Sequence, residues 1–195
     1  MILPALPMIP GFTISGVLPP FDAEQGPTNP GAMSPYPAAM SEVATRFGGS
    51  ETRRAILRGL LEYRAAVRAA GFVRGFQWLD GSFLEDVELV RRRPPGDVDL
   101  VTFAQRPKNF SDDEWREFVG LRASLFDPQE AKSLYRCDAY FVDLNLKPEI
   151  LVSYTRYWFG LFSHQRATNL WKGMLEVPLD SDDLVAQGML AEEDA

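Results

Sequence analysis

The sequence is poor in cysteine and histidine. Among its 195 residues, Cys137 is the single cysteine and His164 the single histidine. One cysteine excludes an internal disulfide and fits a reducing, cytoplasmic compartment. Cys137 stands beside an acid, and we expect it to be buried and inert. We expect His164 to be structural, because acidic residues described below fill the role of a general base better.

The chain also lacks net positive charge and long apolar runs. Its net charge of −7 argues against a general nucleic-acid coat protein, although one local basic groove is still compatible with it. No apolar run approaches the roughly 18 residues that a membrane helix needs. The first ten residues, "MILPALPMIP", have no basic region and are interrupted by prolines. We therefore expect neither a signal peptide nor a membrane anchor.

What the chain does contain is enough apolar content, 46%, to bury the core of one globular domain. The many prolines of residues 1–40 predict an extended arm that crosses the body of the protein, a partner protein or a second copy. Residues 41–180 are expected to form the domain itself. Residues 181–195 are acidic and are expected to be a frayed tail.

The order of the predicted elements indicates an α/β or α+β fold in which helices flank a mixed central sheet. Helices are expected over 36–48, 51–70 and 111–126, and strands before 81, over 96–104, 137–146 and 171–179, with 148–162 ambiguous. The helix over 51–70 carries five arginines between its apolar positions, and we expect that arginine-rich face to be solvated.

Two acids at the start of a predicted strand are the most informative feature. Asp97 and Asp99 are two residues apart, so on a strand they point to the same side and repel each other. Mg²⁺ offsets such repulsion, and it binds carboxylates together with substrate phosphates. Upstream, Gly81 and Ser82 form a pair whose backbone can approach phosphates closely. The alternative is that "PPGD" is simply a turn that begins a strand.

These strings resemble the signature of the polymerase-beta-like nucleotidyltransferase superfamily. In that signature Gly-Ser follows the first strand, Asp-x-Asp lies on the second, and a third acid lies on a later strand. The string "FQWLDGSFLE…PPGDVDLV" is similar to a group of small standalone bacterial members, as are "SGVLPPF" and "YWFGLF…R…WKGMLEV". The resemblance therefore spans most of the chain. One departure is the 15-residue separation of Ser82 from Asp97, which implies an intervening loop or helical turn.

The resemblance implies roles for individual residues. Gly81 and Ser82 would contact a nucleoside triphosphate (NTP), and Asp97 and Asp99 would be catalytic ligands of Mg²⁺ or Mn²⁺. The third catalytic and metal-binding acid would be Asp138 or Asp143, which lie on opposite faces of one predicted strand. We favour Asp138, because it begins its strand as Asp97 does.

Other residues near the motif carry weaker expectations. Arg166 and Lys172 are candidates for further phosphate contacts. The run 91–93 is three arginines, which form either a solvated loop or a clamp for a triphosphate or an acceptor nucleic acid. Asp80 precedes the Gly-Ser pair, and we expect it to brace the turn rather than to belong to the site.

Two functions from different classes fit these observations. The first is a Mg²⁺-dependent nucleotidyltransferase that moves a nucleoside monophosphate from an NTP to the hydroxyl of a protein, an RNA end, a nucleotide or a small molecule. The resemblance makes a toxin–antitoxin or antiphage defence system plausible for it. The second is a non-catalytic binding or assembly protein on the same scaffold, which would use its arm and acidic surface to bind partners.

Overall fold

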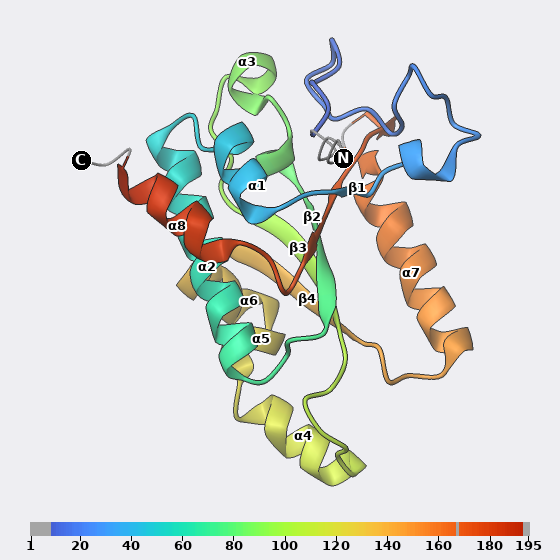
Figure 1. The fold of residues 1–195 in the computed structure, drawn as a ribbon, viewed down its shortest axis with the longest axis vertical. Coiled ribbons are helices and arrows are strands. Elements are labelled where there is room, and N and C mark those ends of the chain that lie inside the picture. The colour runs from blue at the N-terminus through green and yellow to red at the C-terminus, as the bar shows by residue number, and fades with distance from the viewer. Residues whose placement is uncertain (1–8, 167, 193–195) are drawn as a thin grey trace, which may run out of the picture.

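The computed structural model describes residues 9–166 and 168–192 and shows a mixed α+β fold (Figure 1). The first eight residues of the predicted arm lie outside the described residues. The helices are α1 Met40–Phe47, α2 Glu51–Ala69, α3 Val87–Arg91, α4 Asp112–Gly120, α5 Ala123–Phe126, α6 Pro128–Tyr135, α7 Pro148–Phe162 and α8 Asp183–Glu192. The strands are β1 Tyr36–Pro37, β2 Gly75–Asp80, β3 Val98–Ala104, β4 Cys137–Asp143, β5 His164–Gln165, β6 Leu170–Trp171 and β7 Leu175–Pro178.

A mixed sheet with the strand order β1-β7-β2-β3-β4 forms the centre of the molecule. Strand β2 pairs antiparallel with β3 and with β7, whereas β3 with β4 and β1 with β7 are parallel. The strands β5 and β6 form a separate two-stranded hairpin. Strand β1 ends the predicted arm with a proline and lies at the edge of the sheet, where a missing N–H is tolerated.

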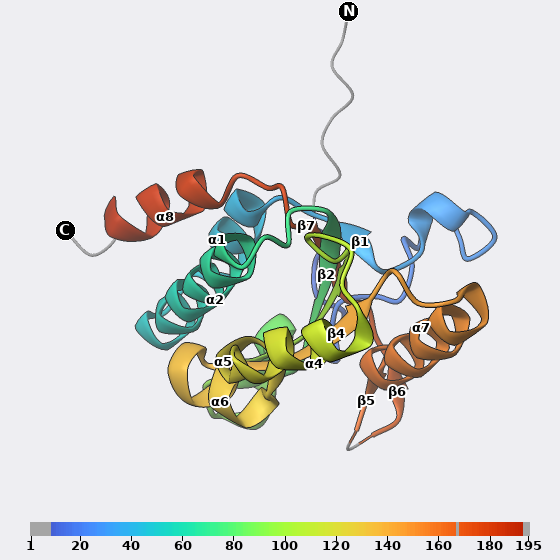
Figure 2. The same ribbon diagram turned by 90° about the horizontal axis from the view of Figure 1, so that it is seen from below.

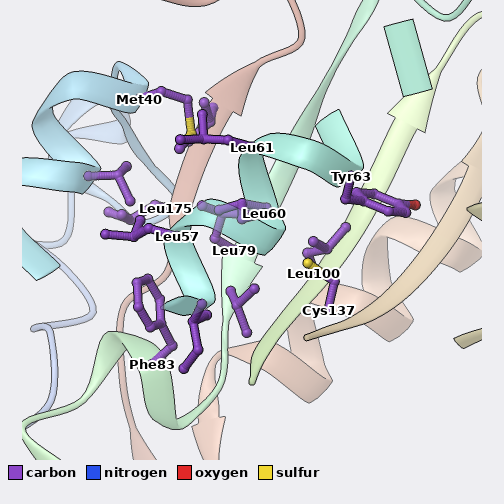
Figure 3. Packing of buried hydrophobic residues seen from close by; sticks show 14 of the residues in the cluster. Met40, Leu57, Leu60, Leu61, Tyr63, Leu79, Phe83, Leu100, Cys137 and Leu175 are labelled. Carbon is purple, nitrogen blue, oxygen red and sulfur yellow. The ribbon is translucent and has the colours of Figure 1, made fainter. Parts of the chain in front are cut away.

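Helices cover both faces of this sheet. Figures 1 and 2 show α7 on one side and α1, α2 and α8 on the other. The larger core lies on the α2 side, where Leu57, Leu60 and Leu61 pack against Leu79 and Leu100 (Figure 3). A smaller cluster on the other face joins side chains of β2, β3 and β4 to α7. No helix among the described residues is long and apolar enough to cross a bilayer.

The predicted elements are present, but several of their boundaries were wrong. The first helix begins at Met40 rather than 36, and β3 begins at Val98, so Asp97 precedes the strand. The helix expected over 111–126 is two helices, because α4 ends at Gly120, a poor helix former. The ambiguous segment 148–162 is the helix α7.

Helix α6 had not been predicted, although its start is marked in the sequence. Asp127 accepts hydrogen bonds from the backbone N–H groups of Gln129 and Glu130, and Pro128 occupies the first turn. An acidic cap followed by proline is a common start of a helix. The helix matters for the site, because it carries Lys132 next to the acid motif.

The expectation of a solvated arginine face on α2 was wrong for two of the five arginines. The guanidinium of Arg53 is buried, pairs with Glu88 at 2.7 Å and donates to the carbonyl of Phe83. Arg64 is completely buried and lies 2.9 Å from a carboxylate oxygen of Asp183. Buried arginines need such partners, because an unpaired charge away from water is costly.

Asp183, the partner of Arg64, corrects the expectation of a frayed acidic tail. Asp183 begins helix α8, and its buried carboxylate receives both Arg64 and Arg68 of α2. Helix α8 thereby packs against α1 and α2, and its Ala186 and Leu190 join the core. The tail is therefore part of the domain at least to the end of α8.

Asp183→Asn is expected to lower the free energy of unfolding by about 3 kcal/mol, because it leaves the Arg64 guanidinium buried without its counter-charge. Chemical denaturation at neutral pH measures the change. The exposed pair of Glu51 and Arg58 on α2 provides the control, since Glu51→Gln should cost less than about 1 kcal/mol. Equal losses in the two variants would contradict this account of the buried pair.

Candidate functional site

A pocket of about 300 Å³ lies on the α7 face of the sheet, where α7 ends and the β5–β6 hairpin begins. It brings together residues from β2, β3, β4, α6 and the hairpin. All seven residues predicted for the site line it: Gly81, Ser82, Asp97, Asp99, Asp138, Arg166 and Lys172. The predicted site residues, which are spread over positions 81–172 of the sequence, therefore lie together in the folded chain.

Three carboxylates form a row across neighbouring strands of this pocket. Asp80 on β2 is the register partner of Asp99 on β3, and Asp99 is the register partner of Asp138 on β4. Register partners on adjacent strands project their side chains to the same face. Asp97 precedes Asp99 by two residues and also lines the pocket. The expectation that Asp80 stands outside the site was therefore wrong.

The register also separates the two candidates for the third acid. Asp138 lies in the row, whereas Asp143 lies at the other end of β4 and binds Arg106 at 2.6 Å. Asp143 is also five residues further along the strand, on the opposite face. Only Asp138 of this pair lines the pocket among the described residues.

The Gly-Ser turn fits tightly against the row. Gly81 has φ +84°, and Ser82 begins a 3-10 turn that ends at Leu84. A Cβ atom at position 81 would stand 1.9 Å from a carboxylate oxygen of Asp99. Glycine is needed here both for the backbone conformation and for space. With glycine at position 81, the backbone of the turn lies closer to the carboxylates than it could with any other residue at that position.

Burial and crowding change the protonation of the central acid. Burial, and then the neighbouring charges of Asp80, Asp97 and Asp138, raise the pKa of Asp99 to about 7. Burial likewise raises the pKa of Asp80 above its ordinary value, in spite of the adjacent Lys172. Like charges held close together in a low dielectric disfavour ionisation. The carboxylates of this row therefore favour a positively charged neighbour.

Two lysines supply part of that positive charge. Lys132 of α6 forms an ion pair with Asp97, and this contact raises the pKa of the ammonium. Lys172 is almost fully buried, with its Nζ 2.8 Å from Asp80 and 3.1 Å from Glu85. Burial alone would lower the pKa of Lys172, but Asp80 and Glu85 together raise it. The structure shows Lys172 as an internal counter-ion, so its predicted role as a phosphate contact gains no support.

The remaining basic residues stand around the pocket. Arg91 donates to Glu85 at 2.9 Å, while Arg93 and Arg166 are exposed residues that line the pocket. The intervening residues form the short helix α3, as the long separation between Ser82 and Asp97 had implied. His164 is exposed, and its Nδ1 lies near Ser163 and the carbonyl of Gly160.

The donor set suits a hard divalent cation, although the side chains do not form a closed cage. Within residues 9–166 and 168–192, no three acidic, histidine or cysteine side chains form a ready metal-binding group. Mg²⁺ commonly takes one or two carboxylates and completes its shell with phosphate oxygens and water. Burial and then the neighbouring acids raise the pKa of Asp99, and a nearby cation would favour its ionised form. Asp97, Asp99 and Asp138 therefore fit a cation that binds together with a phosphate substrate.

Comparison with known proteins places the chain in a family. Residues 10–178 match the family model described as "Family of unknown function (DUF6932)". The chain belongs to DUF6932. No curated protein and no solved structure matches it.

The matched range of DUF6932 includes every residue of the pocket and ends at the last residue of β7. Sequence reasoning missed three of the residues that complete this pocket. Glu85 stands close in sequence to the arginine run, and it pairs with Arg91 six residues on, but its contacts with Gln165 and Lys172, 80 and 87 positions away, had no signal in the sequence. Lys132 was missed with helix α6, whose start could have been read from Asp127 and Pro128. Asp80 was set aside because strand register is not visible in the sequence.

Cys137 meets its expectation. Its side chain is fully buried next to the core of the α2 side, and burial raises the pKa of the thiol. Reactive cysteines have lowered thiol pKa values and some exposure. Cys137 is therefore a packing residue beneath the acid row.

Gly81→Ala in this DUF6932 chain should lower the free energy of unfolding by more than about 1 kcal/mol, because alanine is strained at positive φ and its Cβ would collide with Asp99. Thermal or urea denaturation measures the loss. Gly96→Ala is the matched control, since nothing lies within 4 Å of a Cβ at that position. We expect that control to stay within about 0.5 kcal/mol of the wild type. A larger loss at position 96 than at 81 would contradict the prediction.

The pKa of Asp99 predicts that ionisation of the acid row costs stability. Asp99 loses its proton near pH 3.8 in the unfolded chain and near pH 7 in the folded protein, so its contribution to stability falls as the pH rises between these values. Asp99→Asn cannot ionise. At pH 8 without divalent cations, its free energy of unfolding should exceed that of the wild type by on the order of 2 kcal/mol.

Urea denaturation in EDTA at several pH values measures this difference, which should disappear near pH 4. A wild type that is more stable than Asp99→Asn at pH 8 would contradict the prediction.

Proposed function

We propose that this protein is a nucleotidyltransferase, which transfers a nucleoside monophosphate from an NTP to an acceptor hydroxyl with Mg²⁺ or Mn²⁺. The observation that carries the proposal is the close approach of Gly81, in the Gly81–Ser82 turn, to the carboxylate of Asp99, which is in register with Asp138. A phosphate-binding turn directly beside a cluster of acids suits a metal-bound triphosphate.

The order of the elements supports the same proposal. Strand β2 leads into the Gly-Ser turn, β3 carries the Asp-x-Asp motif at its start, and β4 carries a third acid beside it. This order is the one that the resemblance to polymerase-beta-like nucleotidyltransferases implies, and we propose that the mixed sheet is that fold. The similarity to small standalone bacterial members extends the proposal to a role in toxin–antitoxin or antiphage defence.

Each side chain then has a task in the reaction. The Ser82 hydroxyl and the N–H groups of its turn bind phosphate oxygens of the NTP, and Arg93 and Arg166 bind the phosphates from the open side of the pocket. Asp97, Asp99 and Asp138 would hold the cation, which would supply charge stabilisation for the phosphates.

The reaction itself forms one bond and breaks another. The oxygen of the acceptor hydroxyl bonds to the α-phosphorus of the NTP, and the bond between that phosphorus and pyrophosphate breaks. The hydroxyl proton leaves to a carboxylate of the acid row or to water. Placement of this row on three paired strands keeps its carboxylates in place, so little reorganisation is needed as charge develops.

The test measures binding of each NTP with Mg²⁺ or Mn²⁺ and release of pyrophosphate. Asp97→Ala and Asp138→Asn should each lower turnover by at least about 10²-fold, because charge stabilisation in the transition state is lost. Asp143→Asn is the matched control on the same strand as Asp138, and it should retain turnover. Unchanged activity in Asp97→Ala would overturn the mechanism.

The alternative of a binding or assembly protein is an outcome of the same experiment. Absence of pyrophosphate with every NTP, together with no thermal shift on addition of NTP and Mg²⁺, would favour it over the transferase.

A further inference from the structure

Glu85 is a buried acid beneath the pocket that binds three segments of the chain at once. Its Oε2 accepts hydrogen bonds from Nη2 of Arg91 and Nε2 of Gln165, each at 2.9 Å. Its Oε1 accepts one from Nζ of Lys172 at 3.1 Å. These partners come from α3, from the β5–β6 hairpin and from the segment before β7. The last two are also joined by the pairing of β5 with β6 and by the hydrogen bond from the N–H of Lys172 to the carbonyl of Ser163 at 2.8 Å.

The backbone of Glu85 is fixed as well. Its N–H donates to the carbonyl of Ser82 at 3.2 Å, and its own carbonyl accepts from Arg53 at 2.7 Å. The carboxylate therefore stands in a defined position relative to the Gly-Ser turn. A buried acid with several satisfied hydrogen bonds and fixed backbone makes a rigid junction.

Two exposed arginines extend from the segments that Glu85 holds. Arg93 follows Arg91 by two residues, and Arg166 follows Gln165 directly; both line the pocket. They come from two different segments, and the Glu85 carboxylate is a shared anchor of those segments. The Glu85 carboxylate therefore lies at the base of both arginine-bearing segments, and Arg93 also donates from Nη1 to the carbonyl of Pro94 at 3.1 Å.

We propose that Glu85 is a positioning residue, which sets the places of Arg93 and Arg166 so that they bind the phosphates of a nucleoside triphosphate. This inference rests on the proposed function and adds a residue that acts through others. Groups that support the direct ligands of a site commonly change affinity or activity by about 10- to 100-fold when they are altered.

Charge and position predict opposite effects for the change Glu85→Gln. The change removes a negative charge near the pocket, which by Coulomb's law alone would strengthen the binding of an anionic nucleotide. Loss of the positioning carboxylate would release the two arginine-bearing segments and weaken the binding of the nucleotide. The direction of the change in affinity therefore separates the two effects.

The experiment compares Glu85→Gln with Asp183→Asn in the full chain. Asp183 is the matched control, because it is also a buried acid that binds two basic side chains, but on α8 and outside the pocket. Both variants should lose thermal stability. Only Glu85→Gln should raise the KM for the NTP by about tenfold. The Kd of the NTP, measured in the presence of Mg²⁺, should rise by the same factor.

A second variant keeps the inference testable if Glu85→Gln folds poorly. Gln165→Met removes one contact with Glu85, keeps a similar volume and leaves the net charge unchanged. It should also raise the KM. The double variant should raise the KM by less than the product of the two single effects, since both changes release the same hairpin.

The possible results separate this inference from the proposed function. If the wild type binds no NTP in the presence of Mg²⁺, both the proposed function and the positioning role of Glu85 are rejected. A wild type that binds NTP, with a Glu85→Gln variant that binds it as well as Asp183→Asn or more tightly, overturns the positioning role alone. A selective rise in KM for both Glu85→Gln and Gln165→Met supports it.

Discussion

The repulsion among in-register carboxylates is the constraint on which the site and much of the fold around it depend. Asp80, Asp99 and Asp138 occupy equivalent positions on three adjacent strands, and burial, followed by the charges of the neighbouring acids, raises the pKa of Asp99 to about 7. Pairing of β2, β3 and β4 forces this arrangement, because register fixes which side chains are neighbours. Two lysines lie against these acids: Lys172 is buried beside Asp80, and Lys132 is an exposed residue that pairs with Asp97.

The two faces of the sheet differ: one carries the larger apolar core, and the other carries the pocket. On the α2 side, Leu60, Leu79 and Leu100 belong to a continuous apolar core that holds the strands together. On the α7 side, aromatic packing around Trp78 and Phe103 gives way to polar residues at the end where the Gly-Ser turn lies. A site placed at the end of a well-packed sheet gains rigid support without opening the core.

Local patterns in the sequence were sufficient for much of the fold and for the seven candidate residues that line the pocket. Ser50 caps α2 and Ser111 caps α4, and such caps can be read from the sequence because capping depends on neighbours three residues away. Long-range partners were not predictable in this way. The helical spacing of α2 did not distinguish Arg64, which is buried against Asp183, from an arginine on a solvated face. Asp80 was misjudged for the same reason, since its neighbour Asp99 is found only through strand register.

The sequence by itself determined the type of chemistry that this chain can offer. Gly81 beside Ser82 set a tight turn, and the two-residue spacing of Asp97 and Asp99 set a pair of acids that line the same pocket, because side-chain direction follows from local backbone geometry. Tertiary structure alone decided which acid completes the row, Asp138 rather than Asp143, and which groups support it. Those choices depend on strand register and on contacts between distant segments, and such contacts exist only when the whole chain has folded.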